Sequence, residues 1–397
     1  MNPALDRLQS YPFQKLSALL DGAVPNPALK PISLHIGEPK HPTPEFIRKT
    51  LADNLGGLSS YPTTLGGEGL RIAIAAWLKQ RYALDAIDPQ TQIIPINGSR
   101  EALFAFAQTI IDPTQTDPVV VCPNPFYQIY EGAALLAGAQ PQFLNNLPDN
   151  GYACDFDALP SQVWRRTQLI YVCSPGNPTG GVMALAEWEK LFALSDRYGF
   201  VIAADECYSE IYFEEGRAPL GALQAAQHFG RADYPRLVVF SSLSKRSNVP
   251  GMRSGFVAGD AQILKKFLLY RTYQGCAMSP PIHLASIAAW QDEKHVVENR
   301  RLYREKFDAA LKILQPALGV AMPAAAFYFW APTPVSDTEF TRRLYQEQAV
   351  SVLPGSYLAR EAHGANPGQD RVRIALVAST AECTEAAQRI ATFANNL

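Results

Sequence analysis

Short apolar runs alternate with helical patterns in the middle of the chain, and this alternation constrains the fold more than any other feature. Six apolar runs rich in β-branched residues occur at residues 92–96, 118–122, 168–173, 200–205, 236–242 and 255–259. Helical patterns lie between several of them, at residues 99–111, 128–138 and 185–199. Runs that are apolar throughout and joined by helices indicate a mostly parallel α/β sheet covered on both faces. Ligands bind beyond the carboxyl ends of such strands, so we expect the chemistry just after each run.

The pattern changes near residue 285, where a long charged helical pattern at residues 295–314 leads into shorter mixed segments. A chain of 397 residues is also long for a single core. We therefore expect a large ligand-binding domain over residues 41–284 and a smaller α/β domain over residues 285–397. Residues 1–40 are expected to join the small domain.

The composition excludes several classes of partner. The formal net charge is −2 and the basic residues are scattered, so neither nucleic acid nor a membrane surface is expected as a partner. The start of the chain lacks the pattern of a secretory signal, and the apolar runs are too short to span a bilayer. The six Cys show no paired spacing and no CxxC, which favours a reduced, cytoplasmic setting; no metal site is expected.

The segment SSLSKRSNVPGMRSGF, residues 241–256, follows an apolar run and contains Ser242, Lys245 and Arg253. Lysine alone offers a primary amine that can lose its proton and react with a carbonyl carbon. Arginine and serine are suited to a phosphate, through charge-assisted and hydroxyl hydrogen bonds. For a lone lysine, a polar loop after a strand would be the simpler interpretation.

Two further segments carry polar residues at strand ends. FVIAADECYSEIYF, residues 200–213, places Asp205 at the end of an apolar run, where a carboxylate is costly without a partner. By itself Asp205 would more simply be a surface acid that caps the next helix. CSPGNPTGGVM, residues 173–183, contains Asn177 and by itself indicates a turn.

Taken together, the three segments resemble, in order and spacing, the cofactor-binding segments of class I and II aminotransferases. These enzymes belong to the fold-type I family that uses pyridoxal 5′-phosphate. The resemblance covers nearly the whole chain and implies a large domain with a mostly parallel seven-stranded sheet, plus a smaller α/β domain. It implies that Lys245 holds the cofactor covalently and shuttles a proton at the substrate α-carbon.

The resemblance also assigns roles to other residues of the three segments. Asp205 would pair with the protonated pyridine nitrogen and so keep the ring electron-withdrawing. Asn177 and Tyr208 would contact the ring oxygen, and Asn177 also the substrate carboxylate. Ser242 and Arg253 would bind the phosphate.

Weaker matches complete the cofactor site. INGSREAL, residues 96–103, begins a helix, so Ser99 and Arg100 would offer backbone N–H groups to the phosphate. PNPFYQIY, residues 123–130, resembles the segment whose aromatic residue stacks on the ring; Tyr127 aligns with it, and Phe126 is the alternative. Tyr61 would reach the phosphate of the neighbouring subunit, which implies a homodimer.

On the substrate side, Gly37 in LHIGEPKHPTP, residues 34–44, would line the site. Arg373 aligns with the arginine that binds the substrate α-carboxylate, and Arg371, two residues away on the same strand face, is the alternative. AAAFYFWAP, residues 324–332, departs from the glycine usual there, which leaves its substrate contacts open. His35, Lys40 and His41 lie beside Gly37 and would either meet an acidic substrate or form an exposed loop.

The resemblance implies ping-pong transfer of an amino group between an amino acid and a 2-oxo acid, with glutamate and 2-oxoglutarate as the common pair. Residues 34–44 and 241–256 look most like those of bacterial N-succinyldiaminopimelate aminotransferases of lysine biosynthesis. The same scaffold also supports broad-specificity aspartate or aromatic aminotransferases and β-lyases. Transcription regulators that use this domain carry an added helix-turn-helix region, which we do not expect here.

Overall fold

A seven-stranded sheet forms the centre of the computed structural model, which describes all residues 1–397. The spatial order is β2-β8-β7-β6-β5-β3-β4, and only β8 runs antiparallel to its neighbours. This confirms the predicted mostly parallel α/β sheet. The strands are β2 (Ile93–Ile96), β3 (Val119–Asn124), β4 (Gln140–Asn145), β5 (Thr167–Cys173), β6 (Val201–Asp205), β7 (Leu237–Ser242) and β8 (Gly255–Gly259).

Strand β4 was not among the predicted runs. Its sequence, QPQFLN, is mostly polar, and only Leu144 is fully buried. It lies at one edge of the sheet and pairs with β3 alone. The edge position is not sufficient to remove the signal, because β2 at the opposite edge is buried at all its positions and was predicted. The faces of β4 are only partly covered, so it lacks the continuous apolar run by which the other strands were found.

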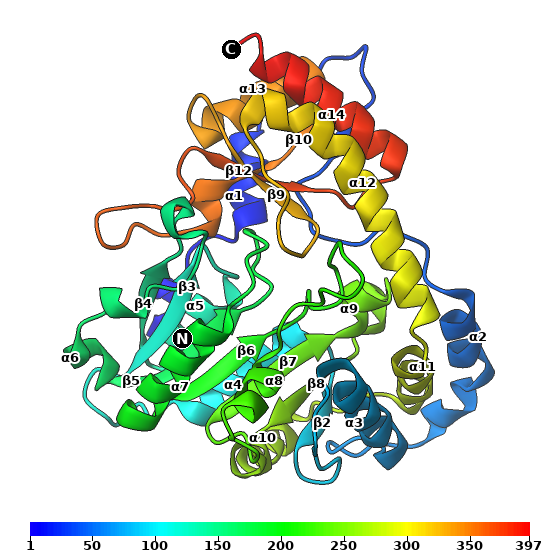
Figure 1. The fold of residues 1–397 in the computed structure, drawn as a ribbon, viewed down its shortest axis with the longest axis vertical. Helices are drawn as coiled ribbons and strands as arrows, with labels where there is room; N and C mark the ends of the chain where they lie inside the picture. The colour runs from blue at the N-terminus through cyan, green and yellow to red at the C-terminus, as the bar shows by residue number, and fades with distance from the viewer.

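The inner strands are mostly apolar because helices cover both faces of the sheet (Figure 1). In β7, Val238 and Phe240 join the apolar cluster of one face, and Leu237 and Val239 join that of the other. The first face is covered by α4 (Ser99–Ile110), α5 (Ile129–Leu136) and α10 (Ala261–Gln274). The second is covered by α2 (Glu45–Asp53), α3 (Glu68–Tyr82), α7 (Leu185–Tyr198), α8 (Ala222–His228) and α11 (Pro280–Gln291).

A second, smaller core lies in the upper part of Figure 1. Its sheet has the order β11-β12-β9, all antiparallel, formed by β9 (Tyr328–Pro332), β11 (Leu353–Pro354) and β12 (Arg371–Ala375). The helices around it are α12 (Lys294–Leu318), α13 (Asp337–Gln348) and α14 (Thr380–Ala394). Figure 1 shows α12 running from the large sheet's side of the molecule up to α14, so this helix links the two parts.

The N-terminal segment divides between the two parts of the molecule. Its first turn, η1 (Pro3–Arg7), contacts α5 of the large part, and Arg7 donates to Gln140 of β4 at 2.8 Å. Strand β1 (Ile32–Ser33) pairs in parallel with β10 (Val350–Ser351), and α1 (Pro12–Leu19) contacts β11. We therefore propose that the expected assignment of residues 1–40 to the small domain holds from α1 onward. The expected boundary after residue 284 falls inside α11, which packs on α2 and α3. We propose that the small domain begins with α12 instead.

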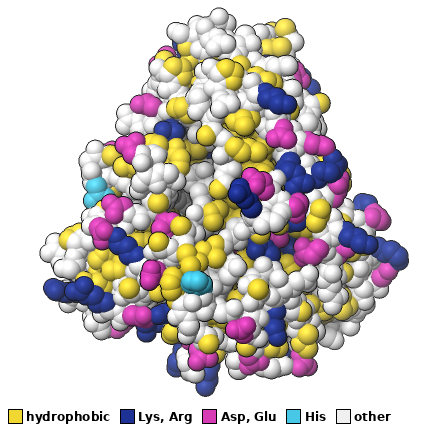
Figure 2. All heavy atoms as spheres, viewed as in Figure 1, with side chains coloured by type: hydrophobic (Ala, Val, Ile, Leu, Met, Phe, Trp, Pro, Cys, Tyr) yellow, Lys and Arg dark blue, Asp and Glu magenta, His cyan; other side chains and the backbone are white.

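The remaining short elements connect these layers: α6 (Ser161–Trp164), α9 (Leu243–Arg246), and the 3-10 turns η1 (Pro3–Arg7), η2 (Leu55–Ser59), η3 (Pro148–Asn150), η4 (Phe156–Ala158), η5 (Pro250–Met252) and η6 (Gly355–Leu358). None of the helices is both long and apolar enough to cross a membrane. Basic and acidic side chains are interspersed over the face drawn in Figure 2.

Candidate active site

A cavity of about 460 Å³ lies at the carboxyl ends of the central strands, between the large sheet and the small domain. Its walls come from the ends of β5, β6 and β7, the start of α4, and residues of β9, β12 and α1. All the residues predicted to form the site line it except Tyr61: Gly37, Ser99, Arg100, Tyr127, Asn177, Asp205, Tyr208, Ser242, Lys245, Arg253 and Arg373.

Lys245 follows β7 on the short helix α9. Its Nζ donates a hydrogen bond of 2.6 Å to the backbone oxygen of Gly37. The pKa of Lys245 is lowered from 10.5 to about 8, chiefly by burial and also by the positive charge of Arg373, against an opposing effect of Cys207. A neutral amine is therefore far more accessible here near neutral pH than for a lysine in water, as a nucleophile or base requires.

Asp205 ends β6 and is only 5% exposed. One carboxylate oxygen accepts from the Tyr130 hydroxyl at 2.8 Å and the other from the Cys207 backbone N–H at 3.2 Å. Burial raises the pKa of Asp205, while these hydrogen bonds act in the opposite direction. The side chain lines the cavity and is buried, so capping of a helix at the surface is not its role. A buried carboxylate in this place suits a cationic partner.

Another part of the cavity wall is suited to an anion. Ser99 is the first residue of α4, Ser242 ends β7, and Arg253 follows η5. The Arg253 guanidinium contacts only neutral oxygens, Ser244 Oγ at 3.4 Å and Pro250 O at 2.9 Å. Gly98, the residue before α4, has φ +87°, a conformation that favours glycine, and a Cβ there would also meet this guanidinium. A helix start, hydroxyl groups and an arginine without an acidic partner are together suited to a phosphate.

Arg373 is the arginine of β12 that faces the cavity. It is 4% exposed, and it donates to Asn177 Oδ1 at 2.9 Å and to His35 O at 2.8 Å. Its Nε is buried and has no partner in the chain. Arg371 does not line the cavity and instead lies 5.9 Å from the ring centre of Tyr152.

Of the two neighbouring aromatic residues, Tyr127 lines the cavity and Phe126 does not. The Tyr127 hydroxyl accepts from Arg100 Nε at 2.6 Å. Phe126 is buried against Phe143, with 5.1 Å between ring centres.

Several cavity residues carried no signal in the sequence. Tyr130 on α5 holds Asp205, and Tyr328 on β9 shares a hydrogen bond of 2.8 Å with the Tyr208 hydroxyl. A Cβ on Gly37 would overlap Tyr328, so the glycine is needed for close approach. Tyr11 and Phe13, at the start of α1, also line the cavity. Tyr130 and Tyr328 lie in segments that sequence analysis had singled out, residues 123–130 and 324–332, but neither residue was assigned a role there.

Other candidates lie outside this cavity. Tyr61 is fully exposed and has no part in the cavity of its own chain. His35 bonds to Ser351 Oγ at 2.9 Å, and His41 bonds to Asn299 Oδ1 at 2.7 Å. Neither histidine lines the cavity, and Lys40 is exposed outside it. The expectation that these three meet an acidic substrate is therefore not supported by their positions.

These features fit pyridoxal 5′-phosphate. The Arg253 guanidinium without an acidic partner suits its phosphate, and the buried Asp205 carboxylate suits its protonated ring nitrogen. Lys245, whose pKa is lowered, supplies the amine that the cofactor needs. The geometry therefore defines an enzyme site of the pyridoxal-phosphate class.

The comparisons with known proteins agree with this class. The family model described as aminotransferase class I and II matches residues 30–390. An LL-diaminopimelate aminotransferase of Nitratidesulfovibrio vulgaris (strain Hildenborough) is 32% identical over 366 residues, covering 91% of this chain and 90% of that protein. An LL-diaminopimelate aminotransferase of Syntrophobacter fumaroxidans is 31% identical and covers 97% of both chains.

Solved structures are similar along the whole chain. An aminotransferase from Neisseria meningitidis Z2491 has a TM-score of 0.96 and 52% identity, covering 99% of each chain. Aminotransferase AspB from Helicobacter pylori 26695 has a TM-score of 0.91 and 34% identity, covering 98% of this chain and 100% of that one. A probable N-succinyldiaminopimelate aminotransferase from Thermus thermophilus has a TM-score of 0.85 and 26% identity, covering 96% and 100%.

The chain belongs to the class I and II aminotransferase family. It is a pyridoxal-phosphate-dependent aminotransferase of fold type I.

Proposed function

We propose that this aminotransferase acts in diaminopimelate and lysine biosynthesis, where it moves the amino group between N-succinyl-LL-2,6-diaminopimelate and the glutamate/2-oxoglutarate pair. Two kinds of relative support it: proteins named LL-diaminopimelate aminotransferase, and a structure named as a probable N-succinyldiaminopimelate aminotransferase. These names favour diaminopimelate substrates over the aspartate, aromatic and β-lyase alternatives.

The observation that carries the proposal is the state of Arg100. Its guanidinium lies at the cavity and donates to the hydroxyls of Tyr127, at 2.6 Å, and Tyr11, at 3.4 Å. No carboxylate of the chain pairs with it, so it keeps its charge for a ligand. Glutamate, 2-oxoglutarate and the succinylated substrate all carry a carboxylate remote from the reacting carbon. We propose that Arg100 binds it.

A second candidate is LL-diaminopimelate without the succinyl group. It differs by a free ammonium group at its far end. Glu38 lines the cavity and has no basic partner in the chain, so its carboxylate offers a place for that ammonium. The relatives named for LL-diaminopimelate also favour this candidate.

We propose that the reaction centre works as follows. When bound, pyridoxal 5′-phosphate supplies an electron-withdrawing ring for the substrate α-carbon. Asp205 holds a proton on the ring nitrogen. Arg373, oriented by Asn177, binds the substrate α-carboxylate through two parallel hydrogen bonds. The Lys245 amine then takes a proton from the α-carbon of the amino-acid substrate. In the second half of the ping-pong reaction it delivers a proton to the α-carbon of the 2-oxo acid, which becomes the new amino acid.

The other residues have binding roles in this proposal. Ser99, Arg100 (through its backbone N–H), Ser242 and Arg253 bind the phosphate, Tyr127 stacks on the ring, and Tyr208 donates to the ring oxygen. Gly37 lines the substrate side. The exposed Tyr61 completes the phosphate site of a second copy, so the enzyme works as a homodimer. All six cysteines are free, which supports a reduced cytoplasmic setting.

A substrate panel tests the proposal. We expect the highest kcat/KM with N-succinyl-LL-2,6-diaminopimelate, ahead of LL-diaminopimelate, aspartate and phenylalanine. Arg100→Gln should lower kcat/KM for glutamate by about 10- to 100-fold, because a hydrogen bond to a charged group contributes about 1.5–3 kcal/mol. The exposed Arg7→Gln is the matched control. Preference for LL-diaminopimelate would select the second candidate, and an equal loss with alanine would refute the role of Arg100.

A further inference from the structure

A buried lysine without an acidic partner lies behind the Gly37 side of the cavity. Lys306 on α12 is 1% exposed. Its Nζ is 2.6 Å from His41 Nε2 and 3.4 Å from the backbone oxygen of Val377, and no carboxylate lies within ion-pair distance. The ring of Tyr303 is 5.0 Å away. Lysine is rarely buried without a pairing acid, so this arrangement calls for a reason.

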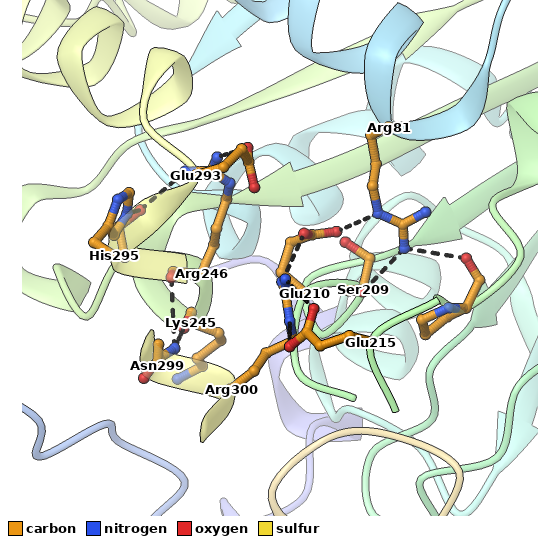
Figure 3. Close-up of polar contacts among 12 residues, drawn as sticks. Arg81, Ser209, Glu210, Glu215, Lys245, Arg246, Glu293, His295, Asn299 and Arg300 are labelled. Atoms are coloured by element: carbon orange, nitrogen blue, oxygen red, sulfur yellow. Dashed lines mark hydrogen bonds and ion pairs between the residues drawn. The ribbon is translucent and has the colours of Figure 1, made fainter. Parts of the chain in front are cut away.

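Asn299, two turns earlier on the same helix, connects the pair formed by Lys306 and His41 to the main chain of Lys245. Its Nδ2 is 3.2 Å from the backbone oxygen of Lys245 and 3.5 Å from that of Arg246. Figure 3 shows Asn299 beside these two residues. Carbonyl oxygens only accept hydrogen bonds, so the Asn299 amide nitrogen must face them. Its Oδ1 is then turned toward His41 Nδ1, at 2.7 Å, and Asn248 Nδ2, at 3.1 Å.

This orientation settles where the proton of His41 lies. Because Asn299 Oδ1 is an acceptor, His41 Nδ1 must carry the hydrogen. His41 Nε2 then presents its lone pair to the Lys306 ammonium. The direction of donation runs without a break from Lys306 through His41 to Asn299, and from Asn299 to the Lys245 carbonyl.

The charges around these hydrogen-bonded residues favour the same arrangement. Burial and the neighbouring Lys306 lower the pKa of His41, while Asn299 and Glu298 act in the opposite direction. Burial lowers the pKa of Lys306 to about 8, against a smaller effect of Cys383. The histidine is therefore neutral and the lysine still mostly protonated near neutral pH, as the direction of donation requires.

The hydrogen bonds among Lys306, His41 and Asn299 join the two loops that meet at the reaction centre. His41 lies four residues after Gly37, whose backbone oxygen accepts from Lys245 Nζ. In the same loop Thr43 Oγ1 donates to Asn248 O at 2.9 Å. Helix α12 itself is fixed to the large domain by Arg300, which pairs with Glu215 at 2.8 Å, as Figure 3 shows.

We propose that Lys306, His41 and Asn299 are positioning residues whose ordered hydrogen bonds fix the loop of residues 34–44 and the main chain of Lys245 to α12. The substrate-facing loop and the catalytic amine thereby keep one position relative to each other. The functional part of this inference rests on the proposed role of Lys245, whereas the protonation state of His41 does not.

Nitrogen-15 NMR of histidine-labelled protein, without cofactor, tests the proton arrangement directly. In the wild type, His41 should be neutral and carry its hydrogen on Nδ1 at pH 7. The signal is assigned by its loss in His41→Gln. In Lys306→Met the repulsion by the ammonium is gone, so His41 should become protonated at a higher pH than in the wild type. A cationic His41, or one with the hydrogen on Nε2, in the wild type at pH 7 would overturn the inference.

Kinetics and hydrogen exchange of the cofactor-loaded enzyme test the positioning. His41→Ala should raise KM for both substrates about tenfold, with a smaller change in kcat, and speed amide exchange in residues 34–44. Asn299→Ala should instead lower kcat and shift the pH at which the visible absorption of the bound cofactor changes. His41→Gln should restore KM, because its Oε1 accepts from Lys306 and its Nε2 donates to Asn299.

The matched control is His295→Gln. His295 comes from the same helix and contacts the segment that follows Lys245, through Ser247 at 2.8 Å. It takes no part in the hydrogen bonds among Lys306, His41 and Asn299. It should leave the exchange of residues 34–44 unchanged. If folded His41→Gln is as impaired as His41→Ala, or if His41→Ala matches the wild type, the positioning role is wrong. A wrong assignment of Lys245 would show in a different result: the visible absorption of the bound cofactor would be unchanged in Lys245→Ala.

Discussion

Replacing Lys245 by Met in the cofactor-free protein should raise its stability at neutral pH. Burial lowers the pKa of this lysine from 10.5 to about 8, so the folded protein holds the charged amine less well than the unfolded chain does. A lowering of this size corresponds to about 3.5 kcal/mol, at about 1.4 kcal/mol for each pKa unit. Met abolishes that cost but loses the hydrogen bond to the Gly37 oxygen, worth about 1 kcal/mol.

The net gain of about 2.5 kcal/mol corresponds to a small rise in melting temperature. At about 2.1 cal/mol/K for each residue, a chain of this length has an unfolding entropy near 0.8 kcal/mol/K. The variant should therefore melt ~2–3 °C above the wild type at pH 7, as measured by calorimetry of the cofactor-free forms.

The pH dependence is the sharper test of the reasoning. The folded pKa lies below the unfolded one, so the cost is complete below about pH 8 and disappears as pH rises past about 10.5. The advantage of the variant over the wild type should therefore shrink by about 2 kcal/mol between pH 7 and pH 9.5. Lys312→Met, at an exposed position of α12, should show no such trend. A difference between Lys245→Met and wild type that stays constant over this range would refute the reasoning.

Three further changes have defined outcomes. Asp205→Ala should still bind the cofactor, as its visible absorption will show, but lose turnover by about a thousandfold or more, because the ring nitrogen no longer keeps its proton; retained turnover would exclude this role. Arg253→Ala should raise the cofactor dissociation constant by about 10- to 100-fold in a fluorescence titration, through loss of charged hydrogen bonds of about 1.5–3 kcal/mol, and an unchanged constant would contradict it. The wild type should scatter light as a dimer, and Tyr61→Phe should weaken cofactor binding while the dimer stays intact; a fully active monomer would contradict the shared site.

The sequence was sufficient to predict the elements that repeat a local pattern. The inner strands were recognisable because each is buried on both faces, and the residues at their ends, such as Asp205 and Lys245, followed from the strand positions and the family resemblance. The same reasoning missed β4, since only Leu144 of that strand is fully buried and its sequence lacks a continuous apolar run.

Contacts between distant segments could not be predicted in this way. Tyr130 reaches Asp205 only because α5 packs on the strand that precedes it, and Tyr328 reaches Gly37 from a separate sheet. His41 and Lys306 are 265 residues apart, and neither shows any local signal of the other. His41 was expected to meet substrate or solvent, but its partners come from α12.

The edge strand β4 also bears on how the protein behaves at high concentration. An open strand edge can pair with the edge of another molecule and begin aggregation. In β4, Pro141 has no backbone N–H to offer, and Gln140 and Gln142 replace the apolar residues that would make such pairing favourable. The polar sequence that concealed this strand thus protects the sheet from growing across molecules.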